Sequence, residues 1–281
     1  EYKLPISSAQ VKSAILLAGV QAPGTTTVIE PEPSRDHTEL MLRKFGATVT
    51  IKDSKNGTRK ISIIGQPELQ AQDISVPGDI SSAAFPLVAA LIIPGSKLTI
   101  TNVGINPLRS GLITSLRDMG ASIKLVNIKD NSGNKTADLI VRASPLKGIN
   151  VPAQRAPSMI DEYPILAIAA AYASGITRMA GLSELRIKES DRIDSIAKGL
   201  ISCGIKVSQT RDTLTVHGNG DNLKGGTVIA ANLDHRIAMA FLVCGMRSNN
   251  PITVDDASSI ETSFPGFRQL INSLGGNIKL L

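Results

Sequence analysis

Runs of small apolar residues recur along the chain, and each is followed by a turn and a short β-prone segment. Their length and composition predict buried helices at residues 11–20, 83–93, 165–173 and 237–246. Residues 165–171 have no polar face, so a helix there must be covered on every side. Short strands are predicted after these helices, at residues 25–29, 97–101, 177–179 and 252–254.

A second helix and a further strand complete each repeat. Amphipathic helices that stop at a glycine are predicted at residues 37–45, 111–119, 192–203 and 267–274. Further strands are predicted at residues 49–51, 123–126, 205–207 and 278–280. The glycine stops recur roughly every 70–85 residues, which suits a small α/β module. Fully apolar helices beside half-exposed ones predict helices inside and sheets outside: an inside-out α/β barrel built from repeated βαβαββ modules.

A polar stretch at residues 65–77, with Pro67 and Pro77, separates the first repeat from the other three. We therefore predict a domain boundary near Val76, with one module in residues 1–76 and three modules in residues 77–281. If each domain is a ring of three modules, the first ring lacks two of them and exposes an apolar seam. The chain is accordingly expected to be a fragment of a longer protein.

Composition narrows the class of protein. Cys203 and Cys244 lie in apolar helical stretches without metal-ligand spacing, which predicts core thiols in a reducing, cytoplasmic compartment. No run of 18 apolar residues predicts a membrane span, and no secretion signal is visible. The net charge of +6 favours acidic partners. Without a long Lys/Arg run or many aromatic residues, small phosphorylated or carboxylated molecules fit better than nucleic acid.

The charged segment 185–192 runs directly into a predicted helix N-terminus. Lys188 and Arg192 stand where the helix dipole is positive, which costs a cation roughly 0.3–1 kcal/mol relative to an anion. A negative ligand would explain this placement, because helix N-termini bind anions. Alternatively, Glu189 and Asp191 neutralise both cations in a surface capping cluster. The pattern leaves both interpretations open.

Two other modules open with residues that suit the same chemistry. Asp161 precedes a predicted helix, where it either caps the N-terminus or takes a proton from a substrate hydroxyl. Asp234 is a natural cap, and Arg236 follows it in the first turn, as Arg192 does in its own module. Two arginines at corresponding positions of two modules would bind phosphate or carboxylate. His235 is expected to be packed and neutral.

The first module opens with a similar set. Ser8 is an ordinary N-cap, and Gln10 could read ligand oxygens. Arg35 again places a cation just before a helix, whereas residues 78–82 carry only a cap signature. No phosphate loop, dinucleotide fingerprint, zinc spacing or nucleophile elbow is present in the sequence. We therefore expect acid/base and electrostatic chemistry without a metal or cofactor.

Several of these segments together resemble a known family. They are residues 8–10, 35–39, 159–162, 188–192 and 234–236. The whole chain resembles the 3-phosphoshikimate 1-carboxyvinyltransferases, particularly their glyphosate-tolerant branch. The resemblance implies the enolpyruvyl transferase fold of two three-module domains, with two modules and a strand absent on the N-terminal side. It also implies transfer of the enolpyruvyl group of phosphoenolpyruvate to the 5-hydroxyl of shikimate 3-phosphate, with release of phosphate, in the shikimate pathway to chorismate and the aromatic amino acids.

The resemblance further implies a role for each matching residue. Asp161 would accept the proton of the 5-hydroxyl, Lys188 would contact that hydroxyl, and Glu189 would protonate the vinyl carbon and later take the proton back. The shikimate 3-phosphate ligands would be Ser8, Ala9, Gln10, Arg35, Asp161 and Lys188. The phosphoenolpyruvate ligands would be Gln10, Arg192 and Arg236. A cytoplasmic monomer without cofactor is expected.

The sequence also departs from the family pattern. Thr262 and Ser263 precede Phe264 where other branches place a Lys, and Glu184 stands where other members have an Asn. The family's N-terminal Lys, Ser and Arg cluster has no counterpart, so the isolated chain is expected to lack useful turnover. Two alternatives stay open: a UDP-N-acetylglucosamine enolpyruvyl transferase, which shares the modules, and an RNA-binding repeat protein.

Overall fold

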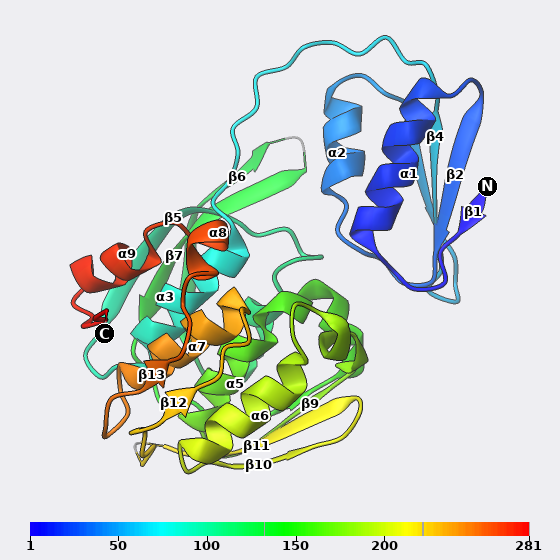
Figure 1. Cartoon of the computed structure of the whole chain (residues 1–281). Helices are drawn as coiled ribbons and strands as arrows, with labels where there is room; N and C mark the ends of the chain where they lie inside the picture. Colours follow the sequence, from blue (N-terminus) through cyan, green and yellow to red (C-terminus); the bar gives the residue numbers. More distant parts are fainter. Residues whose placement is uncertain (132, 221, 281) are drawn as a thin grey trace. The chain divides into compact units, whose positions relative to one another are not determined.

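The structure, a computed structural model shown in Figure 1, describes residues 1–131, 133–220 and 222–280. It divides into two compact units. Unit 1 comprises Glu1–Pro77, Gly104–Arg109 and Ile128–Thr136, and unit 2 comprises Gly78–Val103, Ser110–Asn127 and Ala137–Leu281. Residues 67–77 contain no helix or strand. The boundary near Val76 and the assignment of three modules to residues 77–281 stay predictions.

Unit 1 contains the first module. Its elements are β1 (Tyr2–Lys3), α1 (Ala9–Gln21), β2 (Thr25–Glu30), α2 (His37–Lys44), β3 (Val49–Asp53) and β4 (Arg59–Ile64). The sheet has the order β1-β2-β4-β3, in which β1 and β2 are parallel while β4 is antiparallel to both β2 and β3. Because β1 and β2 run the same way, the loops that lead into α1 and α2 leave the same edge of the sheet.

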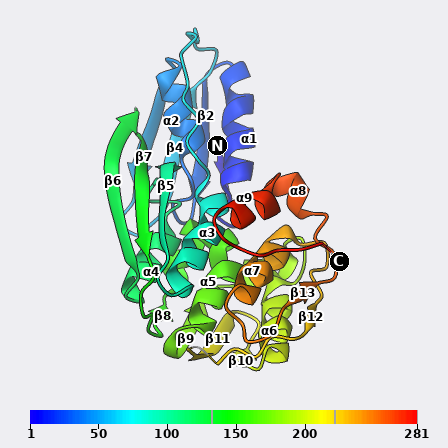
Figure 2. The same cartoon turned by 90° about the vertical axis from the view of Figure 1, so that its left-hand side faces the viewer.

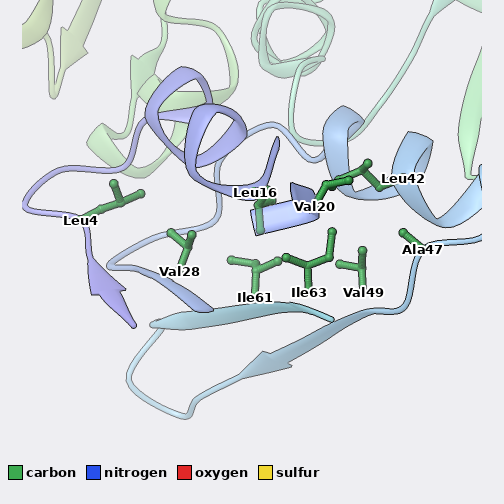
Figure 3. Packing of buried hydrophobic residues seen from close by; sticks show 9 residues of the cluster. All are labelled: Leu4, Leu16, Val20, Val28, Leu42, Ala47, Val49, Ile61 and Ile63. Carbon is green, nitrogen blue, oxygen red and sulfur yellow. The ribbon is translucent and has the colours of Figure 1, made fainter. Parts of the chain in front are cut away.

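Both helices of unit 1 pack on one face of this sheet (Figure 3). The buried side chains between them are Leu4, Leu16, Val20, Val28, Leu42, Ala47, Val49, Ile61 and Ile63. They alternate along β4 and β3 and recur at helical spacing in α1, so burial of apolar surface fixes both helices on the sheet.

The outward face of α1 departs from the sequence prediction. Val11 and Leu17 are 44% and 51% exposed, so the expectation of a helix buried on every side is wrong for α1. In the described part of the chain, unit 1 contains no second helix of the Ala-rich type that could cover this face. An incomplete ring of modules would expose an apolar strip of this kind.

Unit 2 begins with the second module and continues with the third. The second consists of α3 (Ile80–Ile92), β5 (Lys97–Gly104), α4 (Gly111–Asp118), β6 (Ser122–Asn131) and β7 (Asn134–Arg142), with the outer ends of β6 and β7 assigned to unit 1. The third consists of β8 (Asn150–Val151), η1 (Ala153–Ser158), η2 (Ile160–Glu162), α5 (Tyr163–Ala171), β9 (Ser174–Ala180), η3 (Ser183–Ile187), α6 (Arg192–Ser202), β10 (Lys206–Gln209) and β11 (Thr213–Asn219). Their sheets have the orders β5-β7-β6 and β10-β11-β9-β8. The latter repeats the order seen in unit 1.

The fourth module completes unit 2. Its elements are β12 (Val228–Ile229), α7 (His235–Gly245), β13 (Thr253–Val254), α8 (Ile260–Ser263) and α9 (Phe267–Ser273). The Ala-rich helices α3, α5 and α7 pack against one another, with the sheets outside them (Figure 2). Every residue of α5 is buried, as its lack of a polar face requires. The inside-out arrangement predicted from the sequence is confirmed in unit 2.

Two strand predictions need correction or completion. Residues 278–280 form no strand, because both backbone groups of Ile278 bond to the side chain of Asn272, at 2.8 and 2.9 Å. The second hairpin strands, whose positions the sequence analysis did not locate, are β4, β7 and β11. Each of them lies inside its sheet rather than at an edge.

Both cysteines are free and buried, which confirms the prediction of core thiols for Cys203 and Cys244. Within residues 1–131, 133–220 and 222–280, no helix is long and apolar enough to cross a membrane. The same residues contain no group of three or more His, Cys, Asp or Glu side chains arranged to hold a metal ion.

Candidate active site

The candidate residues of unit 1 lie where α1 and α2 begin. Ser8 caps α1 by accepting a hydrogen bond from the backbone N–H of Val11 at 3.3 Å, and Ala9 and Gln10 form the first turn. Arg35 lies in the loop between β2 and α2. Since both loops leave the same edge of the parallel pair β1–β2, the structure brings these four predicted residues together on one edge of unit 1.

Arg35, Asp36 and Arg109 are the charged residues that act on the imidazole of His37. His37 opens α2, and burial lowers the pKa of its imidazole; Arg109 and Arg35 lower this pKa further, while Asp36 raises it. Asp36 accepts a hydrogen bond from Nδ2 of Asn106 at 2.7 Å, which holds the start of α2. The lowered pKa favours the neutral imidazole.

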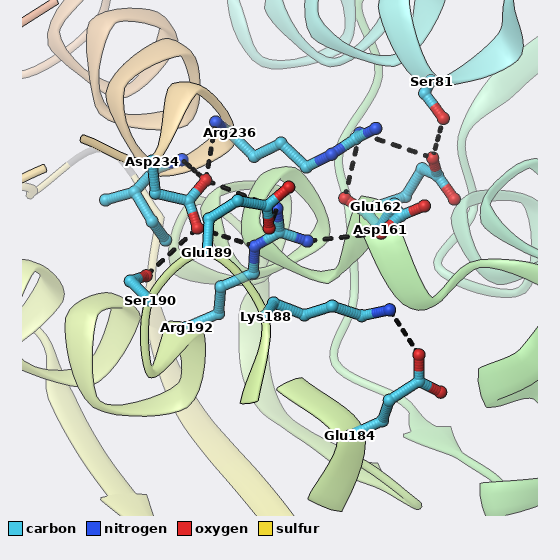
Figure 4. A network of polar contacts seen from close by, with 11 residues as sticks. Ser81, Asp161, Glu162, Glu184, Lys188, Glu189, Ser190, Arg192, Asp234 and Arg236 are labelled. Carbon is cyan, nitrogen blue, oxygen red and sulfur yellow. Dashed lines mark hydrogen bonds and ion pairs between the residues drawn. The ribbon is translucent and has the colours of Figure 1, made fainter. Parts of the chain in front are cut away.

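The candidate residues of unit 2 also lie at helix starts. As predicted, the segment 185–192 runs into α6, which begins at Arg192 and is capped by Asp191. Asp234 caps α7 by accepting hydrogen bonds from the backbone N–H groups of Arg236 and Ile237, at 2.9 and 3.4 Å. Asp161 lies in η2, directly before α5. The third and fourth modules thus contribute to one polar network (Figure 4).

Arg192 is the centre of this network and is fully buried. Its Nε lies 2.8 Å from Oδ2 of Asp234, its Nη1 lies 3.3 Å from Oδ1 of Asp161, and its Nη2 bonds to Glu189. Burial lowers the pKa of the guanidinium, but these three carboxylates outweigh burial and raise the pKa above its usual range. Arg192 therefore stays charged and joins the predicted acid, Glu189, to the predicted base, Asp161.

Arg236 reaches the same place from α7. Its Nη1 donates to the backbone carbonyl of Asp161 at 3.3 Å and lies 3.8 Å from Oε1 of Glu162. Ser81, at the start of α3, donates to the same carboxylate. The side chain of Arg236 is 14% exposed, whereas that of Arg192 is fully buried, so Arg236 is the more accessible of the two guanidinium groups.

Lys188 follows η3, and its ammonium group pairs with Glu184 (Figure 4). Of the five predicted residues of unit 2, the printed sequence places Lys188 next to Glu189, and the structure joins the other four by hydrogen bonds and ion pairs: Asp161, Glu189, Arg192 and Arg236. The chemical role of each stays a prediction.

The geometry also decides between the structural alternatives. Asp161 does not cap α5: the N-cap residue is Glu162, without a side-chain hydrogen bond. The capping interpretation of Asp161 is therefore wrong, because its carboxylate pairs with Arg192. Glu189 does neutralise Arg192, but Asp191 pairs with Arg186 at 2.9 Å rather than with either predicted cation.

Sequence reasoning missed several members of this network. Glu162 and Ser81 were assigned no role, Asp234 was considered only as a cap, and the pairing of Glu184 with Lys188 was not anticipated. A signal existed for Glu162, since it adjoins Asp161 in the sequence. Lys188, Arg192 and Arg236 form ion pairs with five carboxylates, those of Asp161, Glu162, Glu184, Glu189 and Asp234.

An inside-out bundle of α/β modules, with cations and carboxylates at the helix starts, is the architecture of the enolpyruvyl transferase fold. The enolpyruvyl transferase NikO from Streptomyces tendae matches 94% of this chain with a TM-score of 0.73 at 22% identity, a likeness of fold that covers 58% of that chain. The EPSP synthase from Acinetobacter baumannii matches 99% of this chain with a TM-score of 0.90 at 46% identity, over 63% of its own length.

The family model of EPSP synthase (3-phosphoshikimate 1-carboxyvinyltransferase) matches residues 1–271. The chain belongs to this family. The 3-phosphoshikimate 1-carboxyvinyltransferase of Paramagnetospirillum magneticum is 57% identical over 277 residues, and that of Pseudomonas sp. is 56% identical over 281 residues. In both cases 99% of this chain is covered, and the chain spans 62% of the relative's length.

Proposed function

We propose that this chain serves the transfer of the enolpyruvyl group of phosphoenolpyruvate to the 5-hydroxyl of shikimate 3-phosphate, with release of phosphate. The observation that carries the proposal is that Arg192 of the third module pairs with the carboxylates of Asp161 and Glu189, while Arg236 of the fourth module donates to the backbone carbonyl of Asp161. Such a reaction needs an acid and a base beside cations that bind phosphate and carboxylate. The names of the relatives state the same activity for those proteins.

In the proposed mechanism Asp161 takes the proton of the 5-hydroxyl, and the resulting oxygen attacks C2 of phosphoenolpyruvate. Glu189 gives its proton to C3, which becomes a methyl group. In the second half Glu189 takes a proton back from that methyl group, the C2=C3 double bond re-forms, and the C2–O bond to phosphate breaks. Lys188 contacts the 5-hydroxyl oxygen, and Arg192 and Arg236 bind phosphoenolpyruvate, with Arg236 the more accessible of the two.

Unit 1 supplies the other group of ligands in this proposal. Ser8, Ala9, Gln10 and Arg35 lie on one edge of its sheet and bind shikimate 3-phosphate, and Gln10 also touches phosphoenolpyruvate. Monomeric state and cytoplasmic location stay predictions. The comparisons give no support to either alternative, the UDP-N-acetylglucosamine enolpyruvyl transferase or the RNA-binding protein.

Calorimetry with the 281-residue chain tests the substrate assignment. We expect shikimate 3-phosphate to bind, Arg35→Ala to weaken its binding, and UDP-N-acetylglucosamine to give no heat. Binding of the UDP-sugar in preference to shikimate 3-phosphate would reverse the assignment. Binding of RNA with a steep salt dependence would replace it with the non-enzyme alternative.

Turnover gives a separate test. We expect the 281-residue chain alone to release no useful amount of phosphate, because the N-terminal Lys, Ser and Arg cluster of the family has no counterpart in its sequence. A steady-state assay should run beside a full-length relative. A rate equal to that of the relative would contradict this expectation.

A further inference from the structure

A buried ion cluster in unit 1 is left without a role by the proposed function. Lys12 lies one turn after Ser8, and its side chain is fully buried between two carboxylates. Its Nζ lies 3.2 Å from Oε2 of Glu30, at the end of β2, and 2.8 Å from Oε1 of Glu39, in α2. Both carboxylates are fully buried as well. Such a cluster is expensive to bury, so its geometry must be well defined.

The cluster holds one residue at three points. Nζ of Lys12 donates to the carbonyl oxygen of Ser34 at 3.3 Å. The backbone N–H of Ser34 donates to Oε1 of Glu30 at 3.3 Å, and its hydroxyl donates to Oε2 of Glu30 at 2.6 Å. The N–H, the C=O and the side chain of Ser34 are therefore all bonded to buried ionic groups. Ser34 directly precedes Arg35.

The same cluster joins the two segments that carry the proposed shikimate 3-phosphate ligands. Lys12 belongs to the helix that Ser8 caps, and Ser34 belongs to the loop that carries Arg35. Two further hydrogen bonds join these segments outside the cluster: the hydroxyl of Ser7 donates to the carbonyl oxygen of Glu32 at 2.6 Å and accepts from its N–H at 3.0 Å. The spacing between the start of α1 and Arg35 is thus fixed from inside the unit.

We propose that Lys12, Glu30 and Ser34 are positioning residues, which fix the backbone before Arg35 so that its guanidinium stands at the correct distance from the α1 N-terminus for a phosphorylated ligand. The assignment of the ligand rests on the proposed function; the fixing of the loop does not. A guanidinium forms two parallel hydrogen bonds to phosphate only in a narrow range of orientations, so a mobile loop would lose affinity.

Ser34→Ala is the appropriate variant, because it removes one hydrogen bond of the cluster and keeps all its charges. Replacing Lys12 would instead leave two buried carboxylates unpaired and risks unfolding the unit. Ser13→Ala is the matched control. The hydroxyls of Ser13 and Thr38 form a hydrogen bond of 2.6 Å, which also joins α1 to α2. This hydrogen bond does not involve Ser34.

The first measurement requires no ligand. Backbone ¹⁵N relaxation of the 281-residue chain reports order at residues 34–37. We expect Ser34→Ala to lower the order parameters of these amides, while Ser13→Ala leaves them at the wild-type values. Equal changes in both variants, or none in Ser34→Ala, would overturn the positioning role.

The second measurement is a double-mutant cycle on the affinity for shikimate 3-phosphate. We expect Ser34→Ala to weaken binding about tenfold, the effect of losing one hydrogen bond to a charged group. In the Arg35→Ala background the same change should have no further effect, because Ser34 acts only through Arg35. An equal loss in both backgrounds would overturn the proposal. A wild-type chain with an ordered loop that binds no shikimate 3-phosphate would count against the proposed ligand and leave the fixing of the loop standing.

Discussion

The network around Arg192 allows a sharp prediction about stability. Arg192→Met replaces a fully buried guanidinium by an apolar side chain of similar length. The change removes the ion pair at 2.8 Å with Asp234, whose carboxylate is also fully buried. The carboxylates of Asp161 and Glu189 are 19% and 47% exposed, so water can replace the guanidinium for them but not for Asp234.

The expected loss follows from this burial. Removing one partner of a buried ion pair costs about 3–5 kcal/mol, because the remaining charge stays buried. Asp234 keeps the hydroxyl of Ser190 at 3.0 Å and two backbone N–H groups of α7, which places the loss near the lower limit, about 3 kcal/mol. For a domain of 150–250 residues each kcal/mol shifts Tm by about 2–4 °C, so Tm should fall by roughly 6–12 °C.

Thermal unfolding followed by circular dichroism measures this shift. In the double variant Arg192→Met/Asp234→Asn the buried charge is gone, and we expect recovery of at least about half of the lost stability. Lys198→Met is the control, since its pair with Asp194 is exposed and its removal should leave Tm unchanged. If Arg192→Met unfolded within about 2 °C of the wild type, the pair would not be buried as described, and the reasoning would fail.

Two further predictions test packing and titration. An added Cβ at Gly199 would lie 2.2 Å from Cζ of Phe241, whose ring is fully buried and cannot move aside. Gly199→Ala should therefore lower the free energy of unfolding by about 1–3 kcal/mol in urea titrations, and an unchanged value would contradict the packing of α6 on α7. Burial raises the pKa of Glu39 more than its ion pair with Lys12 lowers it. A group whose pKa is raised by folding stabilises the folded state below its unfolded pKa of 4.5, and this stabilisation is lost as pH rises through the folded pKa. The free energy of unfolding of Glu39→Gln, relative to that of the wild type, should therefore increase from acid to neutral pH. Urea titrations across this pH range measure the difference in the free energy of unfolding between Glu39→Gln and the wild type, and a constant difference would contradict the prediction.

The helices were predictable because the local amino-acid composition indicates which of them are buried. The segment 165–171 has no polar residue, and only a helix inside the module bundle can accommodate it. The strand predicted at residues 278–280 failed because strand pairing depends on a partner far away in the chain. There the side chain of Asn272 forms hydrogen bonds with the backbone N–H and C=O of Ile278, which are then not available to a neighbouring strand.

The site was predictable only in part, for a similar reason. The unfavourable position of a cation at a helix start singled out Arg192 and Arg236 from the sequence alone. Their partners could not be identified in this way, since Asp234 is 42 residues from Arg192 and Asp161 is 31 residues from it. An aspartate before a helix reads as a cap until the fold shows which side chain its carboxylate meets.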